Sequence, residues 1–174
     1  AFGQYQGKQE ELWQLLKLFP LTSVCPSTTS SALTSYWTGR TPNLHGIIGY
    51  EMWVKELSMT INNILHMPSS FSGDVGGLAR AGFDPVTFLG HTSLADRLAE
   101  GGITSDAFLP YSIIGSGLSQ MHVGCSRVHG YVSESDLWIS LAQTLNQRPA
   151  GPKYAYVYWS VMDTLLHRYG RGGK

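Results

Sequence analysis

The chain has 174 residues, 43% of them hydrophobic, and its 12 basic and 12 acidic residues leave no net charge. That length fits one domain of about 100–200 residues with a sizeable core, and the balanced charge argues against a nucleic-acid polymer or a membrane surface as partner. No apolar run approaches the roughly 18–20 residues of a membrane span, so we expect a cytoplasmic protein with a small substrate.

The first predicted elements surround a turn that is rich in hydroxyl groups. Apolar residues at helical spacing predict a helix over Lys8–Phe19. Leu21–Cys25 is predicted as a short buried strand that ends at Pro26, and Ser30–Trp37 as the helix that follows it.

The second half of the chain alternates helices and strands. Thr92–Glu100 is predicted as a helix capped by its threonine and ended by two glycines, and a strand follows at about Ser105–Leu109. Ser133–Gln147 is predicted as a helix with an opening that resembles a capping box, although it has Asp where that motif has Glu or Gln. Tyr154–Trp159 then reads as an aromatic-rich strand.

This alternation favours an α/β fold with a largely parallel sheet that helices cover on both faces. In such sheets, sites form at the carboxyl ends of the strands. Two stretches do not fit the alternation, Met67–Pro85 and Pro110–Gly130, and we expect them to be lids or loop excursions over the active-site face.

Two cysteines, Cys25 and Cys125, are too few and too far apart in sequence to predict a disulfide framework or a cysteine metal site, so we interpret both as free. Four histidines have no partner at metal-ligand spacing, and we interpret them as structural or surface residues: His66, His91, His122 and His129.

The most informative segment, residues 25–46, reads CPSTTSSALTSYWTGRTPNLHG. It places Thr28 and Thr29 at the N-terminus of the predicted helix, where backbone N–H groups and the helix dipole favour an anion such as phosphate. Hydroxyl residues at this position are often no more than helix caps, so the threonines alone would not predict a site.

A second segment, residues 158–170, reads YWSVMDTLLHRYG and follows the last predicted strand. Asp163 and His167 are four residues apart, which puts both side chains on one face of a helix, and a carboxylate with an imidazole suits zinc. The alternative is an ordinary exposed helical pair.

Together the two segments resemble the alkaline phosphatase superfamily, and most closely its type I phosphodiesterase/nucleotide pyrophosphatase branch. The resemblance implies a three-layer α/β/α sandwich and a metal-dependent phosphoric-ester hydrolase with two divalent ions, zinc or alternatively manganese. Thr29 matches the metal-bound nucleophile, which would form a covalent phospho-threonine, whereas Thr28 matches a variable position. Asp163 and His167 match two ligands of one ion, and His45 belongs to a His-Gly turn whose role we expect to be structural, such as bonding to backbone carbonyls.

The sequence also departs from the family pattern. Tyr50 stands where nucleotide pyrophosphatases have a phosphate-binding asparagine, and we expect it to contact the substrate. Cys25 lies four residues before the nucleophile position, which argues against the sulfatase branch. Other metal ligands of the family have no match within residues 1–174, so we expect a single, incomplete catalytic domain that is part of a longer polypeptide and is inactive by itself.

Two classes of function remain open. The first is a phosphoric-ester hydrolase of the phosphodiesterase type, with a phosphonate hydrolase or a phosphomonoesterase as variants of the same chemistry. The second is a non-catalytic fragment or relative that binds phosphorylated ligands. Three matched residues, Thr29, Asp163 and His167, favour the enzyme, while the oligomeric state stays open.

Overall fold

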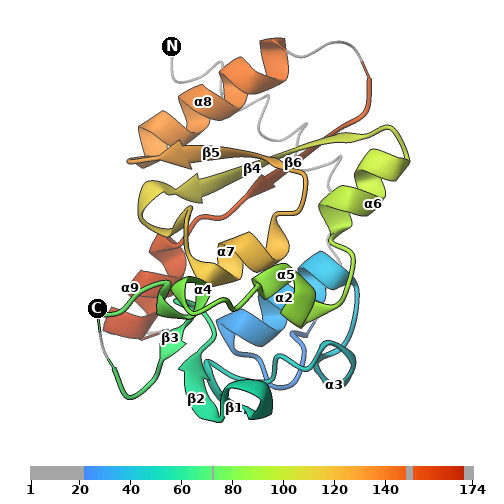
Figure 1. Cartoon of the computed structure of the whole chain (residues 1–174). Helices are drawn as coiled ribbons and strands as arrows, with labels where there is room; N and C mark the ends of the chain where they lie inside the picture. Colours follow the sequence, from blue (N-terminus) through green and yellow to red (C-terminus); the bar gives the residue numbers. More distant parts are fainter. Residues whose placement is uncertain (1–21, 72, 148–150, 171–174) are drawn as a thin grey trace.

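The computed structural model describes residues 22–71, 73–147 and 151–170 (Figure 1). This part of the chain forms two small sheets with helices around them. The predicted helix Lys8–Phe19 lies outside the described residues. Both cysteines are free.

A parallel sheet is built from β4 (Thr104–Pro110), β5 (Arg127–Tyr131) and β6 (Lys153–Val157), with β4 in the centre. Its central strand is almost wholly buried because a neighbour lies on each side of it. The strand predicted at Ser105–Leu109 is thus confirmed, and the one predicted at Tyr154–Trp159 begins one residue earlier and ends at Val157.

Helices contact both faces of this sheet. On one face, Leu137 of α8 (Glu134–Gln147) packs against Phe108 and Tyr131. On the other, Trp37 of α2 (Thr29–Thr38) meets the ring of Tyr156 edge-on, with centroids 4.8 Å apart. Figure 1 shows α8 above the strands and α2 below them. The α/β class with a parallel sheet is confirmed.

A second, antiparallel sheet consists of β1 (Glu51–Val54), β2 (Met59–Asn62) and β3 (Met67–Pro68). The 3₁₀ turn η1 (Lys55–Leu57) joins its first two strands. The sequence analysis did not predict this sheet, because four-residue and two-residue strands are too short for a recognisable alternation.

The remaining helices are short and connect or cover the sheets. Two of these helices (residues 77–80 and 117–122) and a 3₁₀ turn (residues 111–113) fall inside the stretches predicted as loop excursions. Those stretches are therefore partly helical. These elements are α3 (Pro42–His45), α4 (Gly77–Arg80), α5 (Pro85–Leu89), α6 (Leu94–Glu100), η2 (Tyr111–Ile113), α7 (Gly117–His122) and α9 (Val161–Tyr169).

Three local predictions need correction. Thr22–Cys25 is irregular and exposed or half-buried rather than a buried strand, because its hydroxyl residues face solvent. The cap of α6 is Ser93, not Thr92, since the Ser93 hydroxyl accepts the N–H of Ala95. The Pro110–Gly130 stretch ends within strand β5.

The opening of α8 is a variant of the capping box. Ser133 Oγ accepts the Asp136 N–H at 3.2 Å, as the motif requires. The shorter Asp136 carboxylate accepts the N–H of Val132 at 2.9 Å, one residue before the position that a capping-box side chain reaches. Asp136 thus still fixes the start of the helix.

Two histidines are buried around α2 and α7 and carry no positive charge at neutral pH. Burial lowers the pKa of His66 to about 4, and its ring lies so close to Gly117 that a Cβ there would be 1.9 Å away. Burial and the nearby His45 and His66 lower the pKa of His122 to about 3. Both rings are therefore neutral packing elements of the core.

These pKa values predict that the free energy of unfolding falls in acid. An unfolded histidine binds a proton below pH of about 6.5, whereas His66 and His122 stay neutral in the folded state down to about 4 and 3. The unfolded state therefore binds more protons, and each histidine lowers stability by up to about 1.4 kcal/mol per pH unit below 6.5. Urea denaturation at pH 7.5, 6.0 and 5.0 measures the slope.

His66→Asn is the matched variant, because Asn tolerates the left-handed backbone at this position (φ 47°) and does not titrate. We expect it to reduce the acid slope by about half. A stability that is equal at pH 7.5 and 5.0 would contradict the buried neutral state of both rings.

Candidate active site

The N-terminus of α2 distinguishes its two threonines. Thr28 is the N-cap: its Oγ1 accepts the Ser31 N–H at 3.4 Å and donates to Ser31 Oγ at 3.1 Å. Thr29 is the first helical residue and is exposed. Among the described residues, no hydrogen-bond partner holds the Thr29 hydroxyl. The cap thus uses the hydroxyl of Thr28, whereas the hydroxyl of Thr29 is left without a partner in the described part of the chain.

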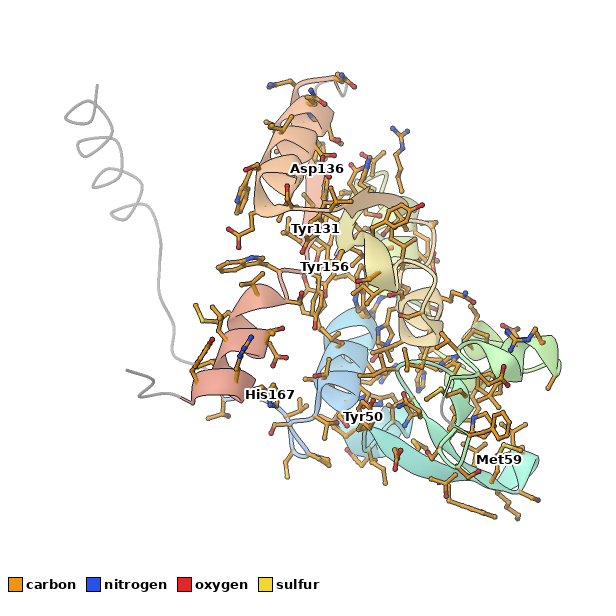
Figure 2. All side chains as sticks on the ribbon, turned by 90° about the vertical axis from the view of Figure 1, so that its left-hand side faces the viewer. Tyr50, Met59, Tyr131, Asp136, Tyr156 and His167 are labelled. Carbon is orange, nitrogen blue, oxygen red and sulfur yellow. The ribbon has the colours of Figure 1, made fainter. Side chains whose placement is uncertain are left out.

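A loop that follows α3 is tied to this end of α2 through one carbonyl group. The Gly49 oxygen accepts hydrogen bonds from Ser30 Oγ at 2.7 Å and from Asn63 Nδ2 at 2.8 Å. The next residue, Tyr50, accepts the Asn63 N–H through its own carbonyl at 2.9 Å. Its side chain is 48% exposed, and Figure 2 shows it next to α2. The structure thereby brings Tyr50 to the helix end that carries Thr29.

The His-Gly turn is held by its histidine. His45 Nδ1 accepts the Ile47 N–H at 3.1 Å, so the ring proton lies on Nε2, which donates to Ser35 Oγ on α2 at 2.9 Å. Burial is the main cause that lowers the pKa of His45. The expected structural role agrees with these contacts to a backbone N–H and a hydroxyl.

On α9, Asp163 and His167 lie one helical turn apart with Oδ1 and Nε2 separated by 3.6 Å. This distance exceeds the 2.7–3.2 Å of ordinary N–H···O hydrogen bonds. Two ligands that each lie about 2.0–2.2 Å from one tetrahedral ion are about 3.3–3.6 Å apart. The carboxylate and the imidazole, 62% and 82% exposed, therefore fit a shared divalent cation.

A divalent ion held by this pair would need further ligands. Within the described ranges, no group of three or more His, Cys, Asp or Glu side chains is placed to hold one ion. Among the described residues, no hydrogen bond or ion pair joins Thr29 to Asp163 or His167, and both figures show α9 standing apart from α2. The structure thus brings Asp163 to His167, and Tyr50 to the end of α2, but leaves these two groups separate.

A cavity of about 160 Å³ adjoins Thr29. Residues just beyond the ends of two parallel strands line it, namely Ser112 after β4 and Ser160 after β6. This is the edge of the sheet at which α/β proteins place their sites. Sequence reasoning missed the walls of the cavity, including His122, because they come from segments far apart in the chain.

The other histidines make structural contacts, in accord with their interpretation. His129 Nε2 lies 2.8 Å from Asp106 Oδ1 of the neighbouring strand, and its ring stacks on Phe108. His91 Nε2 donates to the Leu44 carbonyl at 3.1 Å. His66 Nε2 is buried without a partner in the described part of the chain.

A family model described as Type I phosphodiesterase / nucleotide pyrophosphatase matches residues 10–173. No curated protein and no solved structure matches the chain. Of the helices that the structure describes, none has the length and apolar character needed to cross a membrane.

The geometry on α9 predicts that Asp163 and His167 share one metal ion, at about 2.0–2.2 Å from each ligand atom for zinc. An anomalous-scattering map of zinc-soaked crystals of the intact protein measures these distances. Asp163→Ala and His167→Ala should each remove the peak and keep the melting temperature, because both side chains are exposed. Thr164→Ala on the same helix is the control, and a peak that survives both ligand changes would contradict the assignment.

Proposed function

Since this chain belongs to the type I phosphodiesterase/nucleotide pyrophosphatase family, whose members are phosphoric-ester hydrolases, we propose that it performs phosphoryl transfer through Thr29. The observation that carries the proposal is the contrast at the start of α2. Thr28 is bound into the cap, while the exposed Thr29 hydroxyl has no partner in the described part of the chain.

In the proposed reaction, Thr29 Oγ1 attacks the phosphorus of a small phosphoric ester. The new Oγ1–P bond forms as the bond from phosphorus to the leaving oxygen breaks, and the threonine proton is lost to solvent. Water then hydrolyses the phospho-threonine and restores the hydroxyl. The N-terminus of the ten-residue helix α2, with its dipole, favours the negative charge that develops on the phosphoryl oxygens.

The family is generally metal-dependent, and the donor set on α9 fits that chemistry. We propose that Asp163 and His167 hold one divalent ion and that Thr29 is a ligand of a second, with zinc as the first choice and manganese as the alternative. Bound divalent ions lower the pKa of a hydroxyl and stabilise phosphoryl charge. The remaining ligands would come from residues outside the described ranges.

Tyr50 is the proposed substrate-binding residue of the His-Gly loop. Its phenol is half-exposed, and the hydrogen bond from Ser30 to the neighbouring Gly49 carbonyl holds this loop against α2. A phenol offers one hydrogen-bond donor to a phosphoryl oxygen.

The wider architecture follows the family. We propose that the parallel sheet and the helices on both of its faces belong to an alkaline phosphatase-like three-layer sandwich, and that residues 1–174 form one incomplete domain of it. The stretches 67–85 and 110–130 would cover its site as lids. The second of these contributes Ser112 and His122 to the cavity beside Thr29, which supports that role.

The nucleophile is tested by two neighbouring variants of the intact protein. Thr29→Ala should abolish hydrolysis of a bis-aryl phosphodiester and leave the melting temperature unchanged. Thr28→Ala should lower stability by about 1 kcal/mol through loss of the cap and keep most of the activity. Initial rates and thermal melts measure both. If Thr28→Ala is the variant that removes activity, or if neither does, Thr29 is not the nucleophile.

A polypeptide limited to residues 1–174 should show no turnover, because it supplies three of the ligands that a two-ion site requires. The segment is assayed beside the intact protein with zinc and with manganese. Equal turnover would mean that residues within the segment complete the site. Binding of phosphate by an intact protein that hydrolyses no ester would instead favour the non-catalytic function.

A further inference from the structure

The cavity beside Thr29 has the size of one aromatic ring. Its volume is about 160 Å³. An apolar protein cavity of about 150 Å³ holds benzene, whereas a fused two-ring group is considerably larger. A single aromatic ring therefore matches the volume of this cavity.

The walls of the cavity carry no charge. Among the described residues, no Asp, Glu, Lys or Arg contributes to them, and the surface comes mainly from aliphatic and aromatic side chains, among them Leu33, Ile64 and Trp37. The edge-on contact between Trp37 and Tyr156 makes a firm aromatic wall. Such a lining favours an uncharged, apolar occupant.

The buried polar side chains in the walls, Ser116 and His122, already have partners within the protein. The Thr34 hydroxyl donates to the Ser30 carbonyl at 2.7 Å, so the ring of His122 donates its Nε2 proton to Thr34 Oγ1 at 2.8 Å. Ser116 Oγ donates to Ser119 Oγ, which in turn donates to the Ile113 carbonyl at 2.9 Å. The buried end of the cavity therefore offers a ligand few free hydrogen-bonding groups.

The cavity connects this apolar interior to the reactive hydroxyl. Thr29 and Ser112 are exposed, whereas Trp37, Leu118 and His122 are buried. A ring that enters the cavity can therefore carry its phosphoryl group at the exposed end, beside Thr29.

We propose that this cavity binds a single uncharged aromatic ring of a phosphoester whose phosphorus lies at Thr29, so that phenyl-type esters are preferred over esters of methyl or fused-ring groups. The inference rests on the proposed function for the position of the phosphorus. The fit of the ring depends on the cavity alone.

Inhibition of the intact protein by methylphosphonate, phenylphosphonate and 1-naphthylphosphonate tests the preference. Phenylphosphonate should bind about tenfold more tightly than methylphosphonate, because the ring buries apolar surface, and naphthylphosphonate should lose most of that gain. Ile113→Ala should widen the cavity and raise the affinity for naphthylphosphonate about fivefold. Ile114→Ala removes the same atoms outside the cavity and should leave that affinity unchanged. Equal affinities for the three probes, or equal effects of the two variants, would overturn the proposal.

A second measurement separates the cavity from the reaction. Phenol and 1-naphthol are titrated by NMR into the intact Thr29→Ala variant without added metal, where no hydrolysis is possible. If phenol binds and naphthol does not, the proposed ring preference of the cavity is supported even if the protein hydrolyses no ester. If the unaltered protein hydrolyses esters but the variant does not bind phenol, the proposed ring-binding role of the cavity is wrong, while the proposed function stands.

Discussion

The helix that carries Thr29 is buried through hydroxyl groups, and the rest of the site depends on how those groups are bonded. Four of the five buried residues of α2 are Ser or Thr. A buried hydroxyl without a partner costs about 1–3 kcal/mol, so each needs an acceptor. Thr34 and Thr38 donate to carbonyls one turn back in the same helix, and Ser30 donates to Gly49. Of these three bonds, the one from Ser30 leaves the helix and ties the start of α2 to the Gly49 carbonyl.

That constraint links the two loops of the site to α2. Ser35 of α2 accepts a hydrogen bond from His45. Ser30, at the start of the helix, donates to the Gly49 carbonyl and so fixes the loop that carries Tyr50. At the other end, Arg97 donates to the Thr38 carbonyl at 2.7 Å and caps the helix C-terminus. Hydrogen bonds at both ends thus fix α2, and the groups that surround Thr29 are positioned by their bonds to this helix.

Features set by neighbours in sequence could be predicted from the sequence, and those set by distant contacts could not. The start of α2 follows from Thr28 as a local cap, and the convergence of Asp163 and His167 follows from helical spacing alone. The hydrogen-bond partners of His45 and His122 depend on where α2 meets other segments, so no local sequence pattern could predict them. The strand predicted at Leu21–Cys25 is irregular over Thr22–Cys25, because the hydroxyl residues there face solvent.

Helix α9 and the start of α2 differ in how much a substitution there would cost the stability of the fold. Every residue of Val161–Tyr169 is exposed, so a change at Asp163 or His167 costs the fold little. Thr29, by contrast, is the first residue of a helix whose neighbours are buried. Natural proteins tolerate mutations as long as stability stays above a threshold. Substitutions can thus accumulate on α9 at little cost in stability, whereas changes in the buried part of α2 are opposed by the stability of the core.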